Sequence, residues 1–341
     1  MQIAIVGFGF MGRMHFANWS RCEGVDIVAI CEQNPNVLQN LNNPIGNIEG
    51  LPVAIDLSRV NLYSDLSEML AAERLDAVSI TLPTHLHADC SIRALQAGVH
   101  VLCEKPMALT IDQCDSMIEA AQRSGKHLMI GHCIRFWPEY VKAKELIDSG
   151  HYGRVLAASF RRLTAAPIWS SGNWLTDEQR SGGMPLDLHI HDADFIQYLF
   201  GLPTAVCSHA TLQNDSITHI HTLYDYRDKR AIGAEGSWLP TPSFGFQMSF
   251  DILLEKATVV YDCTCRPTFR LCPADDQPVT PPLADGDGYA REIAHFAALI
   301  QGKTTDPVIT PAQSRDSVRM IEAERLSATT GRPVELTPHN P

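Results

Sequence analysis

The chain of 341 residues lacks the features that mark several classes of protein. No apolar run approaches the ~20 residues of a membrane span, so we expect no transmembrane segment. The 27 Lys and Arg residues form no cluster, and a net charge of −12 disfavours a nucleic-acid partner. The apolar N-terminus has no basic leader and runs directly into glycines, which favours a strand over a signal peptide. Neither an internal repeat nor a low-complexity tract is present.

Cysteine is not scarce, but the pairs typical of metal or redox motifs are missing. The ten cysteines contain no CxxC, and Cys263 and Cys265 are the one closely spaced pair. This usage favours reduced thiols, and hence a cytoplasmic protein. The length exceeds what one hydrophobic core usually serves, so two domains are expected.

A glycine-rich motif follows the first apolar run. The run Ile3–Val6 is rich in β-branched residues, as a buried parallel strand should be. The next six residues, GFGFMG, match GxGxxG and lead into a helical pattern. Such glycines let the backbone turn tightly and approach a pyrophosphate at a helix N-terminus. We therefore expect a dinucleotide site at Gly7, Gly9 and Gly12, the alternative being a glycine-rich turn without a ligand.

Glu32 ends the second predicted strand, twenty residues after Gly12. An acidic residue at this distance meets the adenosine ribose. A carboxylate accepts hydrogen bonds from a free 2′-hydroxyl and repels a 2′-phosphate. Because residues 33–35 contain no arginine, we expect NAD as the cofactor and consider NADP less favoured.

Strand and helix patterns alternate as far as residue 133, which predicts a doubly wound parallel sheet. Ligand chemistry belongs at the carboxyl ends of its strands. His85 and His87 follow one such strand, and Glu104 and Lys105 end another. Lys105 can serve as acid, base or electrostatic clamp, or be an ordinary solvated lysine.

The second half of the chain has a different pattern. From Val155 onward the residues read as successive alternating strands with turn signals. One helix interrupts them near Pro185–Gly201, and two more are expected at about 288–301 and 311–330. We therefore predict a Rossmann domain over 1–133 and an α+β domain with an open, largely antiparallel sheet over 134–341.

Three His-x-His pairs raise the question of a metal site. Histidines at i and i+2 share a face on a strand, but lie about 200° apart on a helix. The spacing of apolar residues over 185–201 predicts a helix. This helix separates His189 from His191 and places Asp187, His191 and Asp194 on one face. A metal centre is therefore disfavoured. Two pairs are expected to be half-buried strand histidines: His85 with His87, and His219 with His221.

Taken together, these motifs resemble the glucose–fructose oxidoreductase / inositol dehydrogenase / rhizopine-catabolism (Gfo/Idh/MocA) family. The stretch TLPTHLHADCSIRALQAGVHVLCEKPMA carries the likeness in the first half, and the triplet Glu104–Lys105–Pro106 is its most specific mark. The segment SGGMPLDLHIHDADFIQYLFG resembles the catalytic helix of the family. The final segments, YAREIAHFAALIQGK and VITPAQSRDSVRMIEAERLSATTGRPVEL, resemble its C-terminal helices and tail.

The resemblance implies roles for matching positions. The backbone at Phe10 and Met11 would face the pyrophosphate, and Glu104 with Lys105 would approach the nicotinamide and the substrate. The open sheet would pair subunits, giving a homodimer or homotetramer. Thr84 and Cys133 stand where many members have Asn, which weakens detailed expectations about cofactor contacts there. The residues expected to line the nicotinamide side are Leu82, Pro83, Thr84 and His87.

The activity expected is the NAD-dependent oxidation of a CH–OH group in a sugar, inositol or related polyol. His191 suits the base, because the unperturbed pKa of histidine is about 6.5. Asp187 would orient the imidazole, and Lys105 would stabilise negative charge on the substrate oxygen. We also expect a substrate contact from Trp174. Three alternatives stay open: an i,i+4 surface pair without chemistry, an NAD-sensing regulator on the same fold, and an NAD-dependent glycosidase.

Overall fold

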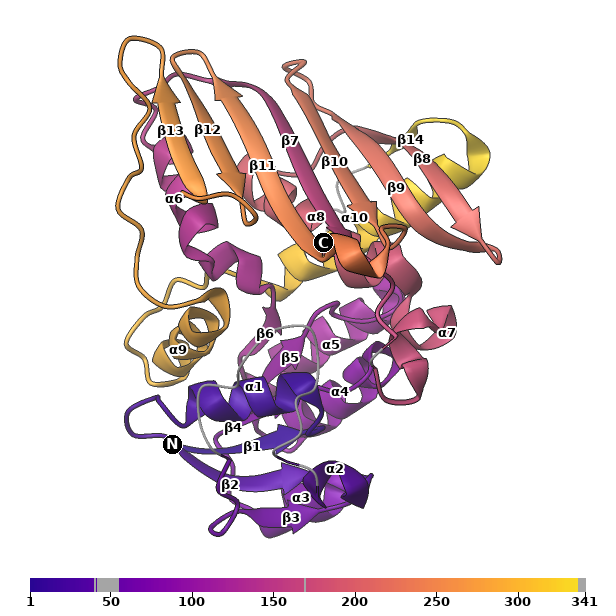
Figure 1. The fold of residues 1–341 in the computed structure, drawn as a ribbon. Helices are drawn as coiled ribbons and strands as arrows, with labels where there is room; N and C mark the ends of the chain where they lie inside the picture. Colours follow the sequence, from indigo (N-terminus) through magenta and orange to yellow (C-terminus); the bar gives the residue numbers. More distant parts are fainter. Residues whose placement is uncertain (40, 42–54, 169, 337–341) are drawn as a thin grey trace. The chain divides into compact units, whose positions relative to one another are not determined.

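The computed structural model describes residues 1–39, 41, 55–168 and 170–336 (Figure 1). No helix among these residues is both long and apolar enough to cross a membrane. The chain divides into two compact units, and two late segments of the chain return to the first of them. The first unit holds Met1–Cys133, Trp169–Leu175 and Asp287–Arg315, and the second holds Ile134–Ile168, Thr176–Gly286 and Asp316–Pro341.

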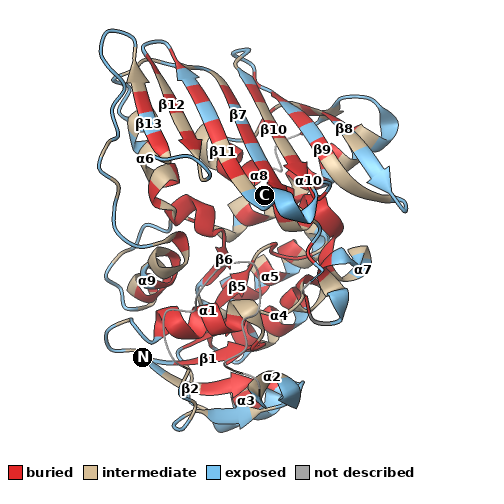
Figure 2. Ribbon diagram, viewed as in Figure 1, coloured by how far each residue is buried: buried red, intermediate tan, exposed pale blue. Residues whose placement is uncertain are grey.

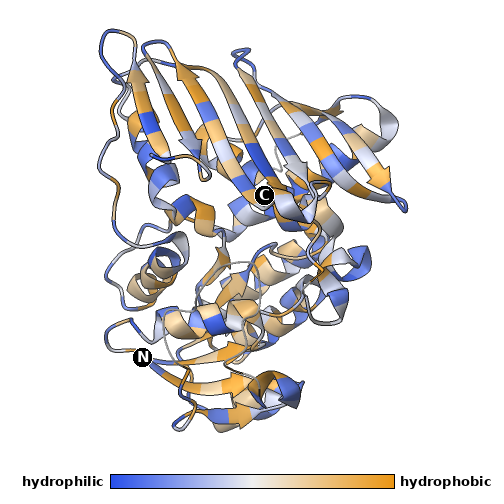
Figure 3. Ribbon diagram, viewed as in Figure 1, coloured by the Kyte–Doolittle hydropathy of each residue, from blue (hydrophilic) through white to orange (hydrophobic). Residues whose placement is uncertain are grey.

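The first unit is built on a six-stranded sheet in the order β3-β2-β1-β4-β5-β6. Every neighbouring pair is parallel, and this order is that of the doubly wound dinucleotide-binding fold. Hydrophobic residues concentrate along these strands (Figure 3). The predicted parallel sheet is therefore confirmed. Its strands are β1 Gln2–Val6, β2 Asp26–Cys31, β3 Asn61–Tyr63, β4 Ala77–Ile80, β5 His100–Glu104 and β6 Leu128–Gly131.

Helices connect the strands of the first sheet. Helix α5 shows the predicted signals at both ends: the Thr110 hydroxyl accepts a hydrogen bond from the Gln113 N–H, and Gly125 ends the helix with φ 64°. The late helix α9 packs on α1, where Phe296 meets the edge of Trp19. The helices are α1 Phe10–Trp19, α2 Pro35–Gln39, α3 Leu66–Ala72, α4 His87–Gln96, α5 Ile111–Ser124 and α9 Gly288–Ile300, with short 3₁₀ turns η1 Thr84–Leu86, η2 Cys133–Phe136 and η3 Ser171–Thr176.

The second unit contains an eight-stranded sheet in the order β13-β12-β11-β7-β10-β9-β8-β14. Only the β7–β10 pair is parallel, so the predicted largely antiparallel sheet is confirmed. Buried and exposed residues alternate along β9 and β11 (Figure 2), as one covered face requires. The strands are β7 Val155–Thr164, β8 Ala205–Gln213, β9 Ser216–Asp225, β10 Ala231–Ser237, β11 Phe246–Leu254, β12 Ala257–Asp262, β13 Phe269–Pro273 and β14 Val334–Glu335.

An aromatic cluster joins this sheet to its helices. Tyr140 packs edge-on against Phe195, Phe250 and Tyr261, with ring centroids 4.8–5.4 Å apart. Such rings bury large apolar area and prefer this geometry. The cluster fixes α8 against the covered face of the sheet. The remaining elements are α6 Pro138–Asp148, α7 Glu178–Ser181, the π turn η4 Pro185–His189, α8 Ile190–Phe200, the 3₁₀ turn η5 Pro242–Phe244 and α10 Pro311–Thr330.

Candidate active site

The glycine motif forms a tight loop between β1 and α1, and each glycine meets a different requirement. Gly7 has φ +86°, a conformation that side chains disfavour. A Cβ atom on Gly12 would lie 2.1 Å from the Gly7 carbonyl oxygen, whereas one on Gly9 would meet nothing within 4 Å. The loop is tied to β4 through the Thr81 hydroxyl, which donates to the Gly7 oxygen at 2.6 Å. Turning, close helix packing and open space for a pyrophosphate are the three needs of a dinucleotide motif.

Glu32 lies at the same loop, directly after β2. Its carboxylate accepts the Phe8 N–H at 2.7 Å and the Asn34 N–H at 2.8 Å. A carboxylate has about four acceptor positions, so two remain for ribose hydroxyls. Phe10 and Met11 begin α1, where backbone N–H groups have no partner within the helix. The loop, the helix start and Glu32 therefore fit the phosphates and ribose of a dinucleotide.

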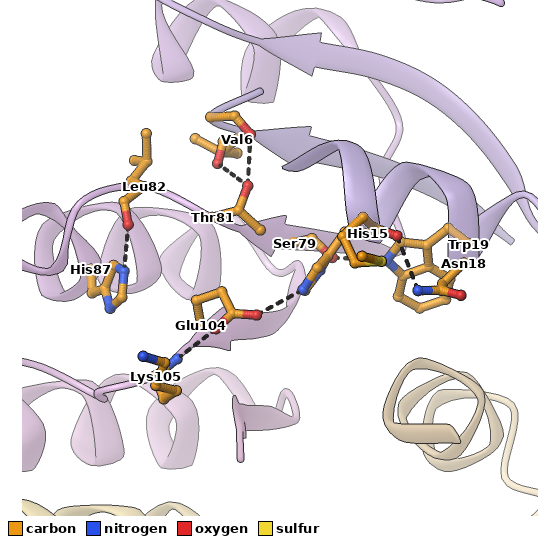
Figure 4. Close-up of polar contacts among 12 residues, drawn as sticks. Val6, His15, Asn18, Trp19, Ser79, Thr81, Leu82, His87, Glu104 and Lys105 are labelled. Carbon is orange, nitrogen blue, oxygen red and sulfur yellow. Dashed lines mark hydrogen bonds and ion pairs between the residues drawn. The ribbon is translucent and has the colours of Figure 1, made fainter. Parts of the chain in front are cut away.

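The residues after β4 are less accessible than the sequence suggested. His87 is buried at the start of α4, with Nδ1 2.8 Å from the Pro106 oxygen and Nε2 2.8 Å from the Leu82 oxygen (Figure 4). Burial lowers the pKa of His87, although both carbonyls favour its charged form. A neutral ring donates to one carbonyl only, so His87 braces the loops after β4 and β5. Thr84 is also buried, while Leu82 and Pro83 are half-buried.

The expected strand histidines divide between two kinds of structure. His85 lies in η1 and His87 in α4, so the strand assignment was wrong for this pair. Pro83 separates them from β4, and the chain turns directly into a helix there. His219 and His221 do lie on β9, the first half-buried and the second exposed.

Glu104 ends β5 and links α1 to the residue that follows the strand. Its Oε1 lies 3.0 Å from Nε2 of His15, and its Oε2 accepts the Lys105 N–H at 3.2 Å (Figure 4). Burial alone raises the pKa of Glu104, but the hydrogen bond and charge of His15 lower it overall. The ionised carboxylate therefore holds the backbone of Lys105, whose side chain is half-buried.

A second carboxyl group completes this cluster. Glu292, on α9, is fully buried, and neither of its oxygens has a hydrogen-bond partner among the residues that the structure describes. His15, Glu104 and Glu292 bring their polar atoms within 4.8 Å of one another, a grouping that could hold a metal ion. However, burial and the charge of Glu104 raise the pKa of Glu292 well above its usual value. A proton on Glu292 removes the second negative charge that a divalent cation would need.

Asp187 and His191 lie on a helical segment that is otherwise inaccessible. Asp187 and His191 are half-buried, and all the remaining residues from Ser181 to Gln197 are buried. The segment begins with the π turn η4 and continues as α8, so the two side chains are one turn apart. The helical prediction, and with it the separation of His189 from His191, agrees with the structure.

Asp194 does not share this face, and that expectation was wrong. It is fully buried, and its two oxygens accept from Nε and Nη2 of Arg135, both at 2.8 Å. The neighbouring Asp192 makes a similar pair with Arg162 at 2.9 and 3.0 Å. A buried carboxylate needs an opposite charge, and both arginines come from segments more than 25 residues earlier. The two pairs hold α8 rigidly beneath Asp187 and His191.

Trp174 lies in η3 and is half-buried. Its segment groups with the first unit, although the predicted boundary placed it in the second domain.

No signal in the sequence singles out His15 and Glu292. No spacing connects α1, β5 and α9, and both side chains look like ordinary polar positions on amphipathic helices.

A parallel sheet with a dinucleotide loop, followed by a unit that presents an Asp–His pair, is typical of a two-domain NAD-dependent oxidoreductase. Residues 1–132 match the oxidoreductase family with an NAD-binding Rossmann fold, Gfo/Idh/MocA, and residues 140–260 match the C-terminal domain of that family. A D-apiose dehydrogenase of Paraburkholderia graminis is 30% identical over 98% of this chain and 89% of its own. The chain belongs to the Gfo/Idh/MocA oxidoreductase family, as the sequence resemblance indicated.

Two further relatives align over nearly the full length. D-glucoside 3-dehydrogenase of Escherichia coli is 26% identical and covers 98% of this chain and 97% of its own. The solved structure of a levoglucosan dehydrogenase, in complex with NADH and levoglucosan, superposes with a TM-score of 0.83. It is 21% identical and covers 99% of this chain and all of the other, so this likeness shows the fold.

Proposed function

We propose that this protein is an NAD-dependent dehydrogenase that oxidises a hydroxyl group of a sugar, inositol or related polyol. The observation that carries the proposal is the exposure of Asp187 and His191, alone among the residues from Ser181 to Gln197. An acidic residue and an imidazole one turn apart on a rigid helix suit general base catalysis. The relatives named as apiose and glucoside dehydrogenases support the substrate class.

Each of three side chains has a defined task. His191 takes the proton of the substrate hydroxyl. Asp187 orients the imidazole and stabilises its charged form. Lys105, held through its backbone by Glu104, donates a hydrogen bond to the substrate oxygen and stabilises the negative charge that develops there. The nicotinamide of bound NAD would supply the acceptor for the hydride of the carbinol carbon.

The same proposal assigns the cofactor residues. The open space at Gly9 and the N–H groups of Phe10 and Met11 would receive the pyrophosphate. Glu32 would accept hydrogen bonds from the ribose hydroxyls, which favours NAD over NADP. Residues proposed to contact the remaining cofactor are Gly7, Gly12, Leu82, Pro83, Thr84, His87, Glu104 and Lys105.

Two features of the second half belong to the proposal as well. We assign substrate binding and subunit pairing to the second domain, and a further substrate contact to Trp174, whose segment groups with the first unit. The uncovered face of its sheet exposes large apolar side chains, including Leu156, Leu223 and Leu253, which supports a homodimer or homotetramer. The ten free cysteines support a cytoplasmic location.

The deciding experiment measures NADH absorbance while the protein is incubated with NAD and a panel of sugars, inositols and other polyols. Variants His191→Asn and Lys105→Met should lower kcat by a factor of about 10²–10⁴. The Kd for NAD should be unchanged in His191→Asn, while Lys105→Met, which removes a proposed cofactor contact, should still bind NAD. The matched controls are His221→Asn and Lys303→Met, which alter exposed residues. Full turnover by either site variant, with NAD binding intact, would overturn the assigned roles.

The same assay separates the two remaining alternatives. A glycosidase that oxidises its substrate transiently would cleave glycosides with bound NAD regenerated and no net NADH. A regulator that senses NAD would bind NAD and turn over no member of the panel. Net NADH formation with one class of polyol supports the dehydrogenase.

A further inference from the structure

His189 is the histidine of the DLHIHD stretch to which the catalytic proposal assigns no task. It ends the π turn η4 and is fully buried. The turn closes with the Ile190 N–H donating to the Pro185 oxygen, the i→i−5 pattern that marks a π-bulge and often accompanies a functional site. His189 lies two residues from Asp187 on one side and two from His191 on the other.

The ring of His189 is held by a carboxylate from α10, more than 100 residues later in the chain. Its Nε2 lies 2.9 Å from Oε2 of Glu324, on α10, and neither side chain has exposed surface. Glu324 also accepts from the Tyr224 hydroxyl at 2.8 Å and from the Thr222 hydroxyl at 3.1 Å. Both hydroxyls come from β9. Two hydroxyl donors therefore fix the carboxylate that holds the imidazole.

A glycine on β10 provides the space for this ring. A Cβ atom on Gly236 would lie 2.8 Å from Nδ1 and 2.9 Å from Cβ of His189. The ring stands directly on the backbone of the strand, and a buried imidazole wedged against Glu324 has no room to withdraw. Apolar packing holds the first part of the turn in the same way: Met184 and Leu188 cluster with Ile220 and Trp238.

We propose that His189, held between Glu324 and the backbone of Gly236, is a positioning residue that sets the orientation of the Asp187–His191 pair. This inference rests on the proposed function. Asp187 and His191 are the accessible side chains of an otherwise buried segment, so the anchor of that segment determines their direction. A π turn needs such an anchor, because it is less stable than the α-helical register to which it would otherwise relax.

The charges around His189 support the same role. Although burial lowers the pKa of His189, the charge of Glu324 raises it overall, with a smaller contribution from Asp192 and an opposing one from Arg162. Tyr224, 3.4 Å from Nε2, is the other titratable group in contact. A charged imidazole paired with Glu324 is a stronger and more directional anchor than a neutral one.

The test uses the full chain and moves the ring without changing its chemistry. Gly236→Ala pushes on His189. Gly233→Ala on the same strand is the matched control, because the atoms nearest to its Cβ belong to β9: the Thr222 carbonyl oxygen at 3.2 Å and the Leu223 side chain at 3.3 Å. The polyol assay is run well below the Tm of each variant. Gly236→Ala should lower kcat about tenfold or more and leave the KM for NAD unchanged. His189→Gln should lower kcat similarly, and Gly233→Ala should stay within about twofold of wild type.

A second measurement decides the inference even if no polyol is oxidised. In histidine-labelled protein, the NMR ring signals of His191 are assigned from their loss in His191→Asn. Their chemical shifts should change in Gly236→Ala and His189→Gln and stay the same in Gly233→Ala. Unchanged His191 signals in both site variants would overturn the positioning role, as would normal kcat in an active enzyme. Absence of NADH with every polyol, together with moved His191 signals, would reject the proposed function and keep the positioning role.

Discussion

The carbonyl oxygen of Gly7 lies 2.1 Å from the place that a Cβ atom of Gly12 would take. The close packing of α1 on the glycine loop therefore depends on the missing side chain. At Gly9 the corresponding position is open. The two glycines should therefore respond differently to the same substitution.

We expect Gly12→Ala to destabilise the protein, because backbone must move to make room. Gly9→Ala should fold normally and weaken NAD binding, because its methyl group would stand in the space proposed for the pyrophosphate. Thermal unfolding and NAD titration of both variants check this. An unchanged Kd in a folded Gly9→Ala protein would contradict the proposed cofactor site.

Glu32 provides a prediction about cofactor choice. Wild-type protein should bind NAD more tightly than NADP, because the carboxylate repels a 2′-phosphate. Glu32→Ala should weaken NAD binding about tenfold or more, the value of a hydrogen bond to a charged group, and reduce the preference for NAD. Titrations of both proteins with both cofactors provide the measurement. Tighter binding of NADP by the wild type would reject the inference.

The effect of Glu292→Gln on the free energy of unfolding should become more favourable as the pH rises. Its pKa in the folded protein is raised above 4.5, so the folded state keeps a proton that the unfolded state loses above that pH. Stability from this group is complete below about pH 4.5 and falls by about 1.4 kcal/mol per pH unit until the folded carboxyl ionises. Gln cannot ionise and removes this loss.

Urea unfolding of wild type and Glu292→Gln between pH 4.5 and 8 measures the difference. The stability of the variant relative to wild type should increase with pH. Glu104, whose pKa is lowered, has the opposite pH dependence and is present in both proteins. Because its charge helps to raise the pKa of Glu292, the difference measures the ionisation of Glu292 together with its repulsion from Glu104. A difference that is independent of pH would show that Glu292 is ionised in the folded state.

The buried pair of Arg135 and Asp194 predicts a large stability effect. Both side chains are fully buried, so Asp194→Asn leaves the arginine without a counter-charge and should cost about 3–5 kcal/mol. Glu119→Gln is the matched control. It breaks an exposed pair with Arg123, and such pairs contribute about 0–1 kcal/mol. Similar losses in the two variants would contradict the role of burial.

Much of the fold could be read from local patterns. The apolar strands, the GxGxxG loop, the capping of α5 by Thr110 and Gly125, and the two late helices all appear where the sequence predicts them. Each depends on residues within a few positions of one another. The short strand β3 was not anticipated, because three residues carry too little periodicity to be recognised.

The expectations that failed concern side chains whose environment comes from distant segments. Asp194 has the helical spacing of an exposed partner of His191, yet it is buried and paired with Arg135. The surroundings of His87 were equally hidden, because its two ring nitrogens meet backbone carbonyls from different loops; its place near the nicotinamide stays a prediction. Spacing along one element cannot reveal which of its faces another element will cover.

The sequence by itself therefore determined the class of fold, the dinucleotide motif and the one-turn relation of Asp187 to His191, because these follow from backbone periodicity. Only the tertiary structure decided which polar residues are buried and charged. It joined His15, Glu104 and Glu292 from α1, β5 and α9, and it fixed His189 between Glu324 and Gly236. The physical reason is that desolvation and charge pairing act through space, between groups as far apart in the chain as His15 and Glu292.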